Sequence, residues 1–107
     1  MNRSAVPAVM VAVACTAAAA ETPEHLLKIE FDELAAKATA AIETVNGMEQ
    51  RAKANGQELH PGLIAQRILV QTAMDDAEES LRAKDFDELR ERLKRARAHI
   101  ERLYSMF

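Results

Sequence analysis

The stretch that decides the fold is "FDELRERLKRARAHIERLYSMF", residues 86–107. Its large apolar residues recur at alternating steps of three and four, a spacing that places side chains on one face of an α-helix. Charged residues of both signs stand between them and suit the solvent-facing side of the same helix. The sequence therefore predicts a helix over about 85–106 with a single apolar stripe. The stripe consists of Phe86, Leu89, Leu93, Ala96, Ile100, Leu103 and Phe107.

The residues just before this helix predict a tight turn. Asp85 is a good N-cap, and Glu88 three residues later completes the pattern of a capping box. The segment "LRAKDFDELRERL" (81–93) resembles the turn of many bacterial helical hairpins and TPR-like units. A glycine often precedes the aspartate in those turns, whereas this chain has Lys84. The resemblance implies two helices joined by a short turn; the alternative is that they run on as one. No 34-residue period is present, so a repeat array is not expected.

A second helix is predicted over about 61–83, because Pro61 suits a first helical turn and an apolar stripe follows it. This stripe is broad near its start and narrow near its end. It comprises Leu63, Ile64, Ile68, Leu69, Val70, Met74, Ala77 and Leu81.

A third helical segment precedes these two, over about 23–54. Thr22 is a good N-cap and Pro23 suits the first helical position. The apolar positions again alternate by four and three, which is the seam of a coiled-coil-like contact. Asn46 and Gly47 lie within the seam, and the helix is expected to continue through them. The seam consists of Leu27, Phe31, Leu34, Ala38, Ala41, Val45 and Met48.

The helix over 23–54 is expected to end at Asn55 and Gly56, which are followed by the polar "QELH". Its small residues Ala38 and Ala41 should face the 70–77 part of the next helix. Small side chains opposite larger ones allow two helices to cross closely.

Together these patterns predict an all-α fold: a three-helix, up-down-up antiparallel bundle over residues 21–107, preceded by an apolar signal-like helix or tail. The chain has 107 residues, which is enough for one domain. Aromatic residues are only 4%, so the core is expected to consist mainly of aliphatic side chains and alanine.

Residues 1–20 have the layout of a secretory signal. A short start with Arg3 is followed by an apolar middle and by the small residues Ala18, Ala19 and Ala20. We expect cleavage before Glu21, where dense charge begins. The membrane is therefore expected to be involved only through this N-terminal segment.

The chain's single cysteine, Cys15, offers an alternative. "AVAC" (12–15) resembles the lipobox of bacterial lipoproteins, although Ala12 stands where leucine is usual. The resemblance implies a signal that ends before Cys15 and lipidation of that residue. A retained membrane anchor is the third interpretation. In either cleavage pathway the mature chain has no disulfide, because no second cysteine exists.

Little in the sequence indicates catalysis or a cofactor. The histidines His25, His60 and His99 form no local metal-binding pair, and no C-x-x-C-H haem motif is present. No phosphate-binding loop or nucleophile elbow occurs either. We therefore expect no catalytic, cofactor or metal residues, and the histidines should lie on the surface or cap helices. The net charge of −3 argues against general nucleic-acid binding.

Two charged surfaces are expected on the last two helices. The acidic surface contains Asp75, Asp76, Glu78 and Glu79. The basic surface contains Arg90, Arg92, Lys94, Arg95 and Arg97. We expect the two to pair with each other, or simply to be solvated.

By elimination, the sequence predicts a non-enzymatic, exported protein of the bacterial periplasm or cell envelope that acts by protein–protein contact, as an adaptor or assembly accessory. The alternative is a small-ligand, metal or haem carrier built on a helical bundle. A protein partner or self-association is expected at an apolar patch near one end of the bundle. The patch residues are Ile64, Ile68, Leu69, Tyr104 and Phe107.

Overall fold

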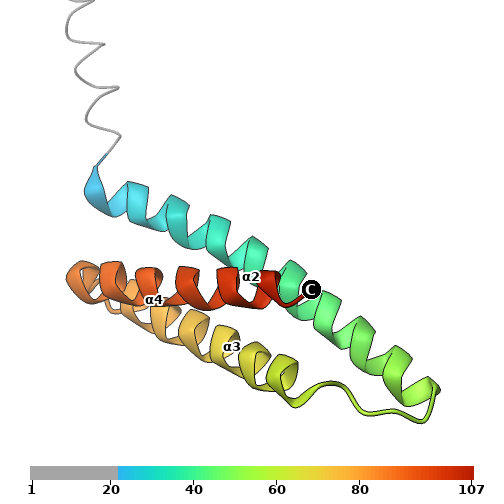
Figure 1. The fold of residues 1–107 in the computed structure, drawn as a ribbon. Helices are drawn as coiled ribbons and strands as arrows, with labels where there is room; N and C mark the ends of the chain where they lie inside the picture. Colours follow the sequence, from blue (N-terminus) through green and yellow to red (C-terminus); the bar gives the residue numbers. More distant parts are fainter. Residues whose placement is uncertain (1–21) are drawn as a thin grey trace, which may run out of the picture.

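The computed structural model describes residues 22–107 and contains three α-helices, with no strand in that range. Helix α2 spans Pro23–Ala54, α3 spans Pro61–Arg82 and α4 spans Phe86–Ser105 (Figure 1). The prediction of an all-α helical bundle is confirmed. Helix α2 continues without a break through Asn46 and Gly47, as expected. Helices α3 and α4 are separate, which excludes the alternative of one continuous helix.

Each helix begins with a side chain that accepts a hydrogen bond from an otherwise unpaired backbone N–H. The hydroxyl of Thr22 accepts from the N–H of His25 at 3.2 Å, and the carboxylate of Asp85 accepts from the N–H of Glu88 at 3.3 Å. At the start of α3, Nδ1 of His60 accepts from the N–H of Gly62 at 2.9 Å. His60 is therefore a helix cap, one of the two roles expected for the histidines.

The capping box predicted at the start of α4 is only half formed. In a full box the Glu88 carboxylate would accept from the Asp85 N–H. That N–H instead donates to the carbonyl of Ser80 at 3.0 Å, and Glu88 pairs with Arg92 at 3.0 Å. The tight turn already satisfies the Asp85 N–H, so the glutamate is available to the arginine one turn later.

Helices α2 and α3 end in the same local structure, a Schellman motif. After α2, Gly56 donates to the Lys53 carbonyl at 3.0 Å and Gln57 donates to the Ala52 carbonyl at 2.7 Å. The turn after α3 repeats both bonds, from Lys84 to Leu81 at 3.1 Å and from Asp85 to Ser80 at 3.0 Å. The residue in the left-handed position is Gly56 in the first motif, with φ of 69°, and Lys84 in the second, with φ of 59°.

We expect Lys84→Gly to stabilise the protein by about 0.5–1 kcal/mol. A left-handed backbone costs a non-glycine residue about 1–2 kcal/mol, and the extra flexibility of glycine when unfolded offsets part of that gain. Thermal melting followed by circular dichroism would measure the change. Ala83→Gly is the matched control, because Ala83 has an ordinary φ of −78° and should lose stability on the same substitution. A melting temperature of Lys84→Gly at or below that of the wild type would contradict the explanation.

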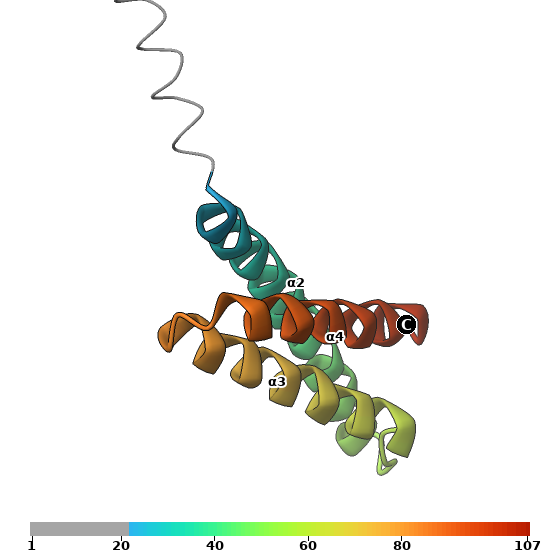
Figure 2. The ribbon, with the colours of Figure 1, turned by 90° about the vertical axis from the view of Figure 1, so that its left-hand side faces the viewer.

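The core runs along the seam between all three helices. Helices α3 and α4 pack most closely, and α2 crosses them obliquely (Figures 1 and 2). The largest fully buried side chains come chiefly from α4, the helix with the clearest sequence pattern. They are Leu89, Leu93, Ile100, Leu103, Val45 and Val70. Phe107 is not in the core, because α4 ends at Ser105 and the stripe cannot continue beyond the helix.

Each of the three helices contributes a fully buried alanine to the core. Ala41 of α2, Ala77 of α3 and Ala96 of α4 are all fully buried. Because a methyl group takes little space, the backbones can approach closely where these residues lie. The size of the residues at these positions therefore sets how closely the helices can pack.

Polar contacts tie α3 to its two neighbours. The buried amide of Gln66 donates to the His99 carbonyl of α4 at 3.1 Å and lies 3.3 Å from Nδ1 of that histidine. On the other side, Arg67 donates to Asn46 at 2.7 Å and to Glu49 at 3.0 Å, both on α2. The hydrogen bond from Arg67 holds the pKa of the Glu49 carboxyl below its usual value.

Of the two alternatives expected for the charged surfaces, ion pairing of one with the other is wrong for the described residues. Within the described residues, each ion pair made by a basic side chain of α4 joins it to an acidic residue of α4 itself or to Glu30 of α2. Arg90 pairs with Asp87 and Lys94 with Glu91, while Arg97 contacts Glu30. Arg92 does reach α3, but it donates to the backbone carbonyl of Asp76 at 2.7 Å, not to a carboxylate. Among the described residues, the acidic side chains of α3 thus form no ion pair with α4, and Glu78 pairs with Arg82 of its own helix.

Candidate partner-binding groove between α2 and α3

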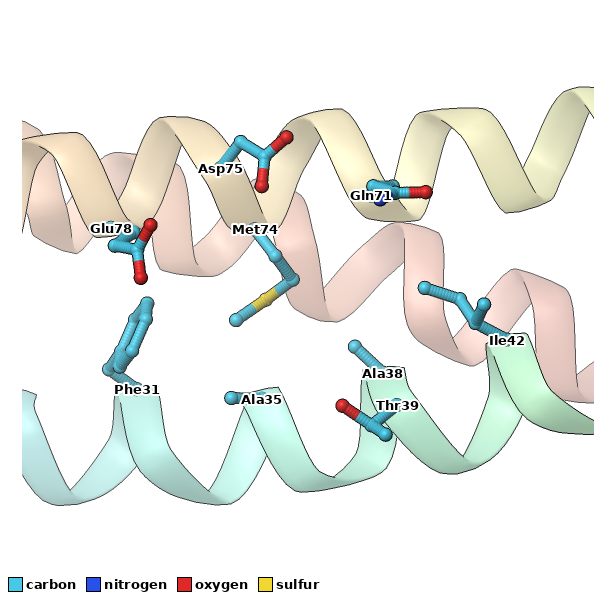
Figure 3. A pocket seen from close by; sticks show the side chains of 9 residues that line it. All are labelled: Phe31, Ala35, Ala38, Thr39, Ile42, Gln71, Met74, Asp75 and Glu78. Carbon is cyan, nitrogen blue, oxygen red and sulfur yellow. The ribbon is translucent and has the colours of Figure 1, made fainter.

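An open groove of about 210 Å³ lies between α2 and α3 (Figure 3). Helix α4 runs behind it in this view, so the groove opens on the side of the α2–α3 pair that faces away from α4. The groove is lined by Phe31, Ala35, Ala38, Thr39, Ile42, Gln71, Met74, Asp75 and Glu78.

The spacing of residues along α2 produces the depth of the groove. Ala35, Ala38 and Thr39 are small and stand on neighbouring turns, between the larger side chains of Phe31 and Ile42. From the opposite side, Met74 of α3 reaches down towards Ala35 and Ala38 (Figure 3). A floor of alanine and methionine between two larger apolar side chains leaves a space that none of this chain's described side chains fills.

The charge of the groove is concentrated on the α3 side. Asp75 and Glu78 stand there, while Thr39 on the α2 side is uncharged (Figure 3). No lysine or arginine lines the groove. Glu78 pairs with Arg82 one turn later at 3.4 Å, but both side chains are more than half exposed, so the pair contributes little. The groove is thus apolar at its floor and negative along one edge.

A second cavity, of about 310 Å³, lies where the loop between α2 and α3 folds back. Its apolar part comes from Leu59, Pro61 and Ile64, and the rest of its lining is polar or charged. The remaining lining residues are Glu49, Lys53, Gln57 and Glu58. Two glutamates and a lysine line this cavity, so its charge is mixed, whereas the charged residues of the α2–α3 groove are all acidic.

The residues of the predicted apolar patch lie in different surroundings. Ile68 and Leu69 of α3 are 57% and 44% exposed. Tyr104 donates through its hydroxyl to the Lys37 carbonyl of α2 at 3.2 Å, and its ring packs edge-on against Phe107 at 5.5 Å. Ile64 is half-buried and lines the cavity at the loop. The observed contacts thus join Tyr104 to Phe107 and place Ile64 beside the loop.

Over residues 22–107, no group of three or more histidine, cysteine, aspartate or glutamate side chains is arranged to hold a metal ion. No helix in that part of the chain is long and apolar enough to cross a membrane. Cys15 and the predicted signal segment 1–20 lie outside the described residues.

Comparison with known protein families, with curated proteins and with solved structures finds no match to this chain.

Sequence reasoning missed the α2–α3 groove, although one signal for it is present. Ala35 and Thr39 flank the α2 seam on the side that turns towards α3, and both are small. A stripe of small residues beside a regular seam marks a place where a neighbouring helix leaves space. The sequence does not reveal which neighbouring helix faces that stripe, so the groove could be recognised only in three dimensions.

Proposed function

We propose that this chain is an exported helical-bundle protein that acts by protein–protein contact in the bacterial cell envelope, as an adaptor or assembly accessory. The observation that carries the proposal is the open α2–α3 groove, with its apolar floor and its acidic edge. Surface hollows of this kind receive side chains from partner proteins, because apolar surface gains by leaving water.

The proposal includes the up-down-up arrangement of the three helices. Two kinds of contact support it. Glu30 contacts Arg97 and Lys37 contacts Tyr104. Residue numbers therefore rise in the same direction along α2 and α4, as in parallel helices. Gln66 contacts His99 and Asp76 contacts Arg92. Residue numbers therefore rise in opposite directions along α3 and α4, as in antiparallel helices.

Export is supported by the sequence of residues 1–20. We propose cleavage after Ala20, with lipidation of Cys15 as the alternative route to the envelope. The two routes differ in the first residue of the mature chain and in whether acyl groups are attached. Stable anchoring by lipid requires more than one acyl chain.

The groove supports contact with a protein better than carriage of a small ligand. Sites for small molecules are usually enclosed and measure roughly 300–1,000 Å³. The α2–α3 groove is smaller, at about 210 Å³, and open along its length. A side chain of a partner protein is held in place by the rest of that protein, so its binding site need not be enclosed.

Site-specific photo-cross-linking in the native host tests this function. A photoreactive residue at Thr39, within the groove, should capture a partner several-fold more efficiently than one at Ala40. Ala40 is the matched control, because it is also exposed on α2 but does not line the groove. Equal capture at both positions would contradict the assignment of function to the groove.

The intact mass of the chain that has not been cross-linked, isolated from the same cells, tests export. We expect a chain that begins at Glu21. A chain that begins at Cys15 with added acyl mass would contradict cleavage after Ala20 and support lipidation of Cys15. A chain that retains Met1 would contradict cleavage by either route.

A further inference from the structure

We infer that the α2–α3 groove receives an amphipathic helix of a partner protein, one that carries a large apolar side chain with lysine or arginine about one turn away. This inference deepens the proposed function and rests on it. Four features support it: the depth of the groove, the nature of its floor, the sign of its charge and the occupants that this charge disfavours.

The depth and floor of the groove fit a single large apolar side chain. Ala35 and Ala38 contribute only methyl groups to the floor, and Phe31 and Ile42 limit it along α2 (Figure 3). Met74 lies against this floor from α3. A methionine is unbranched and flexible, so it can move to accommodate the shape of an entering group. Burial of such a group would remove apolar surface of both partners from water.

A helix is the form of partner that fits between two helices. The walls of the groove are α2 and α3, and its lining residues span about three turns of α2 and about two turns of α3. An added helix would pack its own apolar stripe along this direction, as recurs when amphipathic helices bind hydrophobic grooves. With α4 on the opposite side of the α2–α3 pair, the added helix would complete a four-helix arrangement.

The charge of the groove selects a basic partner. Asp75 and Glu78 are three residues apart, so they stand about 4.5 Å from each other along the helix axis. Within the described chain, Asp75 has no ion-pair partner and Glu78 has only the exposed Arg82. A lysine or arginine on the partner could approach these carboxylates while the apolar side chain fills the floor.

The same charges disfavour other occupants. Phosphate groups of nucleic acids and anionic lipid headgroups would be repelled by Asp75 and Glu78. A second copy that packs α3 against α3 around a two-fold axis would bring the acidic groups of both copies near each other. Such like-charge contacts suppress unsuitable pairings. A basic helix of another protein avoids this repulsion.

A fluorescence titration with two synthetic peptides tests the inference. Both are amphipathic helices with one tryptophan in a leucine stripe; the first carries lysine at all its charged positions and the second carries glutamate. The full chain has no tryptophan, so the tryptophan emission comes from the peptide alone. We expect the lysine peptide to show a blue-shifted, saturable emission change and the glutamate peptide to show none.

Two charge-neutralising double variants locate the binding site. Asp75→Asn with Glu78→Gln should weaken binding of the lysine peptide about fivefold, as expected when two exposed ion pairs are lost. Asp87→Asn with Glu91→Gln is the matched control: it removes the same charge from α4, away from the groove, and should change the affinity less than twofold. Circular dichroism of both variants would establish that the helices are retained.

Several outcomes would overturn the inference. Equal weakening by the two double variants would mean that the lysine peptide responds only to overall charge. Equal binding of both peptides, or binding of neither, would remove the basic helix as the occupant. A cross-link from Thr39 to a second copy of the chain would assign the groove to self-association. A cross-link from Thr39 to another protein, without lysine-peptide binding, would retain the proposed function and reject this inference alone.

Discussion

Replacement of Leu93 by aspartate should unfold the protein. Leu93 lies in the middle of the α4 stripe and is only 1% exposed, so the new carboxylate would be buried away from water. The substitution removes the apolar contacts of the leucine and adds the cost of burying a charge. We expect a loss of at least about 4 kcal/mol, comparable to the whole stability of a small domain.

The measurement is helicity and thermal melting by circular dichroism. Lys94→Asp is the control, because it introduces the same side chain at the adjacent position, where the lysine is 67% exposed. That variant should melt within a few degrees of the wild type. Unchanged helicity and melting of Leu93→Asp would mean that the α4 stripe is not the core.

The second large effect is expected from Ala41→Leu. Ala41 is fully buried in α2, so the three added carbon atoms have no space without moving a neighbouring helix. Overpacking of this kind costs about 1–3 kcal/mol, and close helix crossings belong at the upper end of that range. The melting temperature should therefore fall by roughly 10 °C or more.

Ala40→Leu provides the matched comparison for this prediction. Ala40 is the preceding residue of the same helix and is exposed, so the same added atoms meet only water. Its melting temperature should stay close to that of the wild type. Equal destabilisation by the two substitutions would show that leucine affects α2 generally, and that the crossing is not closely packed at Ala41.

The helices could be predicted from the sequence because their signals are local. Five of the seven residues of the α4 stripe are buried, as the pattern predicts. Thr22, Asp85 and Gly56 stand at helix ends, where such residues are common. These signals depend on residues within a turn or two of each other. A single chain with regular seams therefore reveals where its helices begin and end.

Burial that depends on the neighbouring helix was harder to predict. Ile68 and Leu69 belong to the apolar start of α3 but are exposed, whereas the polar Gln66 is buried. Gln66 is buried because the His99 carbonyl of α4 accepts a hydrogen bond from it. No periodicity within α3 reveals that carbonyl. For the same reason the α2–α3 groove, which lies between two helices, was not predicted.

The order of the helices along the chain has a consequence for how the protein folds. Helices α3 and α4 pack most closely and are joined by a short turn, so they form the pair with the smallest loop-closure cost. This hairpin should assemble first, since folding rates favour contacts between residues near in sequence. Yet α4, which supplies most of the large core side chains, is synthesised after both α2 and α3. Helix α2 is synthesised before α3 and α4, so its apolar seam stays uncovered until they are present.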